Sequence, residues 1–170
     1  MRLYFIVITL FLCYRVSSYV QHLSRIRKNR PLLAGGDDDR KEAKLCEFIR
    51  DAESWGTCRF VVQGEGTILE SLGRLTELRT SANPKSGETL ITLSSHEIPG
   101  FECHIRAGKV RSITNAEVSK FDKKLRITRL IGEDDKNLLS IILSESDQNG
   151  VKAWESTRKK FGDAFSLPIT

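Results

Sequence analysis

The sequence has 170 residues, of which 39% are hydrophobic and 29% charged, as in an ordinary globular protein. Its net charge of +5 arises in the first 36 residues, which hold six of the 27 basic residues and none of the 22 acidic ones. Residues 37–170 hold 21 basic and 22 acidic residues, which disfavours a nucleic-acid-binding domain because such a domain needs a basic face.

The first 18 residues are predicted to be a signal peptide. Arg2 precedes a mostly apolar run over residues 3–14, which is too short to span a bilayer comfortably. Small residues follow at Val16-Ser17-Ser18, where a signal peptidase needs them. A signal anchor is the alternative interpretation of the same run.

Residues 19–39 are predicted to complete the leader. Up to Gly36 this segment is rich in arginine and has no acidic residue, which is typical of an organelle transit peptide. A signal followed by such a segment, with Tyr19 at the cleavage point, resembles the two-part leaders of organisms with secondary plastids. We therefore expect entry into the secretory pathway, delivery to a plastid and no membrane anchor after cleavage. The alternative is a secreted protein with a basic linker.

Residues 40–165 are predicted to form one folded domain. Leu45, Phe48, Ile49 and Ala52 recur at the spacing of a helix with one apolar face, and Gly56 suits its end. The pattern then predicts a hairpin of two strands, 59–63 and 67–72, and a 16-residue polar connection over 73–88, whose first part could continue the strand. A strand over 89–93 and a short helix or turn over 115–120 are predicted next. A strand over 125–131 and a buried central strand over 138–143 complete the predicted sheet.

A second helix is predicted to close the domain, beginning at Ser144 or Ser146 and ending near Phe161. About seven strands framed by two helices indicate an α+β fold with a largely antiparallel sheet. Trp55 and Trp154 are expected in the core. Cys46 and Cys103 are expected to be buried thiols, because the cysteines show no zinc-site or disulfide spacing.

The stretch 101–113 carries the most informative side chains. Residues alternate faces along a strand, so Phe101, Cys103 and Ile105 are expected on a core face, with Glu102, His104 and Arg106 on the other. A two-residue turn at Gly108-Lys109 would place Arg106 opposite Arg111. Two facing arginines are favourable only if something negative lies between them.

Several short motifs, in this order, resemble the ChuX/HutX-type haem utilisation carriers and, more distantly, one half of the ChuS/HemS-type haem-degrading proteins. They are Ser54-Trp55-Gly56, Gly66-Thr67-Ile68-Leu69-Glu70, Leu72-Gly73-Arg74-Leu75, Cys103-His104-Ile105-Arg106-Ala107 and Leu138-Leu139-Ser140-Ile141-Ile142-Leu143. The resemblance covers residues 45–161. It implies a homodimer built on the sheet, with haem bound in a cleft and His104 matching the family's haem-contacting histidine.

This sequence departs from the family at a second histidine, whose position falls near Glu88, so ligation by two histidines is in doubt. His96 is the alternative iron ligand. Haem needs an apolar slot, an imidazole for iron and cations for its propionates, and His104, Arg106 and Arg111 could supply the last two. The resemblance therefore predicts haem or tetrapyrrole carriage in the cell or an organelle, without turnover.

Two other functions remain open at this point. One is a haem-degrading enzyme, by analogy with the degrading relatives. The other is a protein-interaction module that retains the fold without haem. The sequence shows no Ser/His/Asp order, metal-ligand cluster or phosphate loop, so carriage is favoured over independent catalysis.

Overall fold

The computed structural model describes residues 36–120, 123–143 and 148–168, which belong to one compact unit extending from Gly35 to the C-terminus. The predicted signal peptide 1–18 and most of the segment 19–39 lie outside the described residues, as do Ser144 and Ser146. Their assignments stay predictions. Within the described part of the chain, the helices are too short or too polar to cross a membrane.

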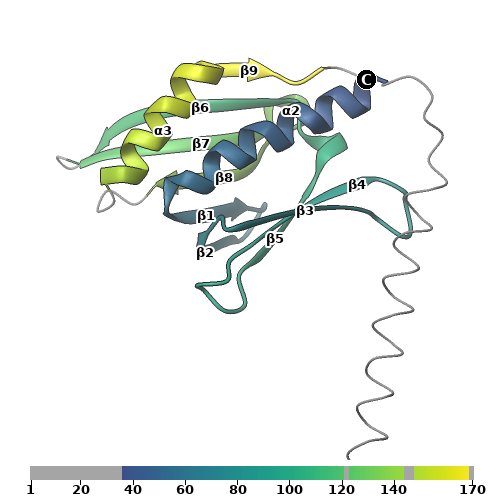
Figure 1. Cartoon of the computed structure of the whole chain (residues 1–170), viewed down its shortest axis with the longest axis horizontal. Helices are drawn as coiled ribbons and strands as arrows, with labels where there is room; N and C mark the ends of the chain where they lie inside the picture. Colours follow the sequence, from purple (N-terminus) through teal and green to yellow (C-terminus); the bar gives the residue numbers. More distant parts are fainter. Residues whose placement is uncertain (1–35, 121–122, 144–147, 169–170) are drawn as a thin grey trace, which may run out of the picture. The chain divides into compact units, whose positions relative to one another are not determined.

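Two helices and nine strands make up this unit (Figure 1). They are α2 (Asp37–Ala52), β1 (Thr57–Gln63), β2 (Ile68–Arg74), β3 (Glu77–Ala82), β4 (Thr89–Ser94), β5 (Glu102–Arg106), β6 (Ser112–Lys120), β7 (Lys123–Ile131), β8 (Asn137–Leu143), α3 (Gln148–Phe161) and β9 (Ala164–Ser166). Three short 3₁₀ turns join them: η1 (Glu53–Trp55), η2 (Ala107–Lys109) and η3 (Glu133–Asp135).

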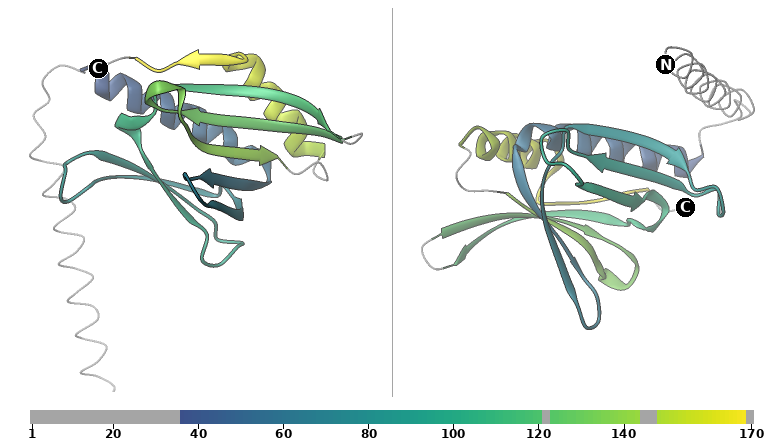
Figure 2. Two further views of the ribbon diagram at one scale, coloured as in Figure 1. Left: turned by 180° about the vertical axis from the view of Figure 1, so that it is seen from behind. Right: turned by 90° about the horizontal axis from the view of Figure 1, so that it is seen from below.

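The strands form a six-stranded sheet, in the order β2-β1-β8-β7-β6-β9, and a three-stranded sheet, in the order β3-β4-β5. Every pairing between neighbours is antiparallel. This confirms the predicted α+β class with a mostly antiparallel sheet, although there are nine strands instead of about seven. Figure 2 shows the three-stranded sheet leaving the larger sheet at an angle.

The two helices lie on one face of the six-stranded sheet, and their apolar sides fill the core (Figure 1). The predicted apolar face of α2 is confirmed, since Leu45, Phe48, Ile49 and Ala52 are all buried. The indole nitrogens of both core tryptophans are satisfied: Trp55 donates to Thr157 Oγ1 at 3.1 Å and Trp154 to Thr128 Oγ1 at 3.1 Å. A buried indole N–H without such a partner would be costly.

The predicted central strand is also confirmed. β8 lies in the middle of the six-stranded sheet, between β1 and β7. Leu139, Ile141 and Leu143 are buried in the core, and Ser140 between them is buried as well. The other face of the strand is only partly covered, since Leu138 and Ile142 are half-buried. The nearly continuous apolar run thus located the central strand correctly, although its two faces are not buried equally.

Two segments were predicted wrongly because their strands are polar. The connection 73–88 contains β3, in which most side chains are exposed, and the segment 115–120 belongs to β6 instead of a helix or turn. β3 is held by its partner, with Leu78 opposite Leu93 and Thr80 opposite Ile91 of β4. Neighbouring strands supplied the apolar surface that these segments lack, so their own sequences gave no strand signal.

The hairpin predicted at Gly108-Lys109 is wrong. η2 occupies this position and carries the chain from one sheet to the other, since β5 pairs with β4 while β6 pairs with β7 and β9. Arg106 therefore lies opposite Leu90, not Arg111. The turn is packed instead of exposed: Ala107 and Val110 are buried, and the buried Lys41 of α2 donates from Nζ to the Gly108 carbonyl at 3.0 Å.

A close contact between Phe101 and Gly73 joins the start of β5 to β2. A Cβ atom on Gly73 would lie 2.6 Å from atoms of the Phe101 ring, closer than carbon atoms approach. The same ring packs against Phe60 of β1, with centroids 4.6 Å apart. The smaller sheet is thus fixed to the larger one by a ring that requires glycine beneath it.

We predict that Gly73→Ala lowers the free energy of unfolding by about 1–3 kcal/mol, because the added methyl group must displace the Phe101 ring. Equilibrium denaturation in urea measures the change. The matched control is Gly66→Ala, whose Cβ would meet nothing within 4 Å, and its effect should stay below about 0.5 kcal/mol. Equal effects of the two substitutions would contradict this account of the contact.

Candidate functional site

The outer face of the three-stranded sheet carries most of the polar and charged side chains of β3, β4 and β5. Cross-strand pairing places Arg79 opposite Thr92, and Thr92 opposite His104, so the three form one row across the sheet. The opposite face carries Ile91 and Ile105, which are buried in the core. The predicted alternation along β5 is therefore confirmed, and we call this outer surface the histidine face.

His104 is held by one nitrogen and exposed at the other. Its Nδ1 lies 2.9 Å from Oγ1 of Thr92, which is buried, with 7% of its surface exposed. Its Nε2 lies 4.0 Å from Glu102 Oε2, which is too long for a hydrogen bond. Of the His104 side chain, 55% is exposed, and Nε2 has no hydrogen-bond partner among the described residues.

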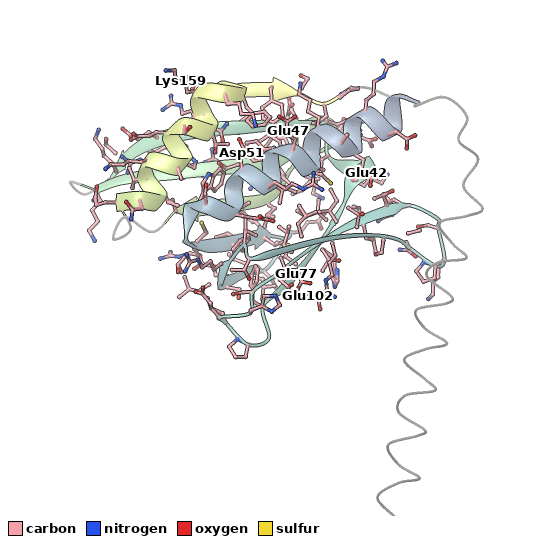
Figure 3. All side chains as sticks on the ribbon, viewed as in Figure 1. Glu42, Glu47, Asp51, Glu77, Glu102 and Lys159 are labelled. Atoms are coloured by element: carbon pink, nitrogen blue, oxygen red, sulfur yellow. The ribbon has the colours of Figure 1, made fainter. Side chains whose placement is uncertain are left out.

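Arg79 links the two histidines through two carboxylates. Its Nη2 lies 3.3 Å from Glu102 Oε1 and its Nε lies 3.7 Å from Glu77 Oε1. The second oxygen of Glu77 lies 3.5 Å from His96 Nε2. Figure 3 shows Glu77 and Glu102 close together on the smaller sheet, apart from Glu42, Glu47 and Asp51, which line α2. His104 and His96 thus stand at opposite ends of one charged cluster.

The two arginines predicted as propionate partners lie in different places. Arg106 shares the histidine face with His104, and its Nη2 lies 2.7 Å from Glu88 Oε2. Arg111 lies between η2 and β6, and its backbone N–H donates to the Ile131 carbonyl of β7. Only Arg106 therefore shares a strand face with His104.

Arg111 forms an ion pair of its own. Its Nη2 lies 2.7 Å from Glu133 Oε1, and this hydrogen bond lowers the pKa of the Glu133 carboxyl below its ordinary value. Its Nη1 is buried and has no hydrogen-bond partner among the described residues. The Arg111 guanidinium therefore lies where the chain passes from one sheet to the other, separate from the cluster around Arg79.

Sequence reasoning missed two residues of the histidine face, Thr92 and Arg79. Arg79 was missed because β3 was taken for a connection. Thr92 could have been found, since it lies between two apolar residues in a predicted strand and must point away from them. Its pairing with His104 depends on the register between β4 and β5, which the sequence does not fix.

The donor set of this face suits a haem iron better than a metal ion held by the protein alone. In the part of the chain that the structure describes, no group of three or more His, Cys, Asp or Glu side chains is placed to hold a metal ion. Cys103 points to the opposite face, and burial raises the pKa of its thiol. An exposed imidazole nitrogen with arginines nearby fits haem, which needs one such ligand and partners for its carboxylates.

One requirement of haem is met only weakly. Leu90 is the single apolar member of the histidine face among its strand residues, and it is half-buried. A porphyrin ring needs a larger apolar surface than one leucine provides. Other residues, from this chain or a second copy, would have to supply it.

Comparisons with known proteins identify solved structures with the same fold. No family model matches the sequence, and no curated protein matches it either. A solved protein of Agrobacterium tumefaciens superposes with a TM-score of 0.58 and 15% identity, over 70% of this chain and 67% of that one. ChuX superposes with a TM-score of 0.55 and 20% identity, over 69% of this chain and 72% of its own. The chain has the ChuX fold.

A longer relative of the ChuX fold also matches. Holo-PhuS, a heme-binding protein from Pseudomonas aeruginosa, superposes with a TM-score of 0.56 and 17% identity, over 67% of this chain and 30% of PhuS. The predicted resemblance to ChuX is thus confirmed for the fold. At identities of 20% or less, the likeness concerns the fold alone, and the ligand has to be argued from the residues.

Proposed function

We propose that this protein binds haem, or a related tetrapyrrole, and carries it without breaking it down. The observation that supports this most directly is the half-exposed imidazole of His104, whose Nδ1 contacts the buried Thr92 and whose Nε2 has no hydrogen-bond partner among the described residues. Bound haem would supply an iron atom that His104 could ligate. Two solved proteins of the same fold, ChuX and PhuS, are described as heme-binding proteins.

Two cations of the histidine face could pair with the propionates. Arg106 and Arg79 both have more than half of their side-chain surface exposed, at 56% each, so a ligand can reach them. Each is already paired with a glutamate, Arg106 with Glu88 and Arg79 with Glu102. A propionate would therefore replace a carboxylate that the protein supplies itself, and the net gain per pair would be modest.

Haem degradation is the second candidate function, because ChuS, which superposes over 68% of this chain with a TM-score of 0.56, is described as a heme oxygenase. Haem mixed with the full-length protein and a reductant separates the two functions. A carrier leaves the Soret absorption of haem intact, while an enzyme replaces it with the absorption of a linear product. Failure to bind haem at all would favour the third function, an interaction module.

We predict that His104→Ala weakens haem binding at least about tenfold, because it removes the iron–nitrogen bond while the rest of the face remains. The absorption spectrum should also lose the features of an imidazole ligand. Titration of haem into the full-length protein measures both. His96→Ala is the matched control, since His96 lies at the other end of the Arg79 cluster, and it should leave the spectrum unchanged.

The reverse result has a clear meaning. If His96→Ala changes the spectrum and His104→Ala does not, the iron ligand is His96. If neither substitution changes the affinity or the spectrum, the histidine face is not the haem site.

We predict that Arg106→Gln and Arg79→Gln each weaken haem binding by about 3- to 30-fold without changing the spectrum, because an arginine–carboxylate pair does not touch the iron. Arg111→Gln provides the comparison, since Arg111 lies between η2 and β6, away from the histidine face, and pairs with Glu133. The geometry leads us to expect the smallest effect there. If Arg111→Gln has the largest effect, the propionates bind near Arg111, where the chain passes from one sheet to the other.

We also propose that two copies associate through β2. This strand is at the edge of the six-stranded sheet, and it carries the most exposed apolar side chains of the described residues. Between 58% and 70% of each of these residues is exposed, and they are Ile68, Leu69 and Leu72. Val62 of the neighbouring strand β1 is 43% exposed. An exposed edge strand with such side chains tends to pair or to be covered. The haem ring also needs apolar surface that the histidine face lacks.

We predict that the full-length protein sediments as a dimer at tens of micromolar, about the range expected for an interface of modest strength. The double substitution Leu69→Asp/Leu72→Asp should give a monomer, because it places charges on both faces of the β2 edge. Val118→Asp, on the distant strand β6, introduces one charge at another exposed apolar position and should leave the dimer intact. A monomeric wild-type protein in this concentration range would rule out the proposed assembly.

A further inference from the structure

We infer that two copies of the chain pack the open face of the six-stranded sheet against each other, with Glu70 of each copy paired to Arg129 of the other. The open face is the one turned away from α2 and α3. This inference specifies the association proposed above and rests on it. Pairing of the β2 edges alone would leave Arg129 outside the interface, because β7 is an interior strand.

A hydrogen bond to α3 shows which side chains of β7 belong to the open face. Trp154 of α3 donates to Thr128 Oγ1 at 3.1 Å, so Thr128 points toward the helices (Figure 1). Its neighbours Ile127 and Arg129 therefore point to the opposite side of the sheet. Cross-strand partners share a face, so Ser140 of β8, which lies opposite Arg129, is on that side too. Among the described elements, no helix covers this side.

Arg129 is a charged group of the open face that lacks a partner. Its side chain is half-buried, and it forms no hydrogen bond or ion pair with the described residues. Its neighbours across the sheet, Ser140 and Thr114, are uncharged. A carboxylate is the favoured partner of a guanidinium in such surroundings, and here it has to come from outside the chain.

The register of the sheet places a glutamate symmetrically to Arg129. One row across the open face consists, in order, of Glu70, Val61, Ser140 and Arg129. The two charged residues are at its ends, three strand spacings or about 14 Å apart. A two-fold axis through the middle of the row, parallel to the strands, therefore brings Glu70 of one copy over Arg129 of the other. Because the axis is two-fold, the dimer contains this ion pair twice.

The neighbouring row has apolar residues at its two ends. Its members, in order, are Leu72, Arg59, Ile142 and Ile127. The same axis brings Leu72 of one copy over Ile127 of the other, which would cover a leucine that is 58% exposed in the single chain. Arg59 already lies 3.7 Å from Glu70, so its charge also has a partner in the dimer. One axis thus pairs charge with charge and apolar with apolar side chains.

The dimensions of stacked sheets suit this arrangement. Two sheets with aligned strands lie about 10 Å apart, a gap that a glutamate and an arginine side chain span together. Val61 and Ser140, which lie beside the axis, are small enough for such an approach. The leader is the other candidate within the chain, but residues 1–36 contain no acidic residue and offer no carboxylate to Arg129.

Charge reversal in the full-length protein tests the pairing. In a dimer of identical chains, Glu70→Arg and Arg129→Glu each place like charges together at both contacts. Each variant should therefore raise the dissociation constant of the dimer at least about tenfold, measured by sedimentation. A 1:1 mixture of the two variants restores both ion pairs and should dimerise as the wild type does. Arg50→Glu, at an exposed position of α2, is the matched control and should leave the dimer intact.

Two results would overturn the inference. One is an Arg129→Glu protein that dimerises like the wild type, which leaves association through the β2 edges standing and assigns the open face to another occupant. The other is a mixture of the two variants that stays monomeric. The mixture also guards against misfolding, since a misfolded chain would not regain dimerisation from its partner. A monomeric wild type would overturn the proposed association itself, and this inference with it.

Discussion

The packing of Phe101 on Gly73 is the contact on which the arrangement of the two sheets depends. Without a Cβ on Gly73, the ring can lie directly on the backbone of β2 and reach Phe60 of β1. The ring immediately precedes β5, the strand in which His104 lies opposite Thr92 of β4. The core contact between the sheets therefore lies directly next to the strand that carries the candidate site.

The parts of the fold that could be predicted are those whose residues carry their own apolar pattern. The apolar residues around Phe48 recur with the 3.6-residue period of a helix, and β8 is almost uniformly apolar. Each element can therefore be predicted from its own sequence. β3 and the second half of β6 are stable only because they pair with strands that bring the buried side chains. The apolar residues that stabilise these strands belong to their partners, so the local sequence alone does not predict them.

The candidate site shows the same division. Alternation along a single strand placed Glu102, His104 and Arg106 on one face, since side-chain direction is a local property. The partners of these residues come from other strands: Thr92 from β4, and Arg79 from β3. Arg111 was assigned to this face because the turn at Gly108 was taken for a hairpin, and a packed 3₁₀ turn separates the two arginines instead.

The pairing of Arg79 and Arg106 with glutamates has a kinetic consequence for any anionic guest. A ligand carboxylate that paired with either guanidinium would displace Glu102 of β5 or Glu88, which directly precedes β4, and the displaced side chain would stay a few ångströms away. The displaced glutamate would compete with the ligand at a high effective concentration, because it can pair with its arginine again as soon as the ligand dissociates. If the protein carries haem as proposed, such a surface would favour rapid exchange over tight retention, because most differences in affinity lie in the rate of dissociation.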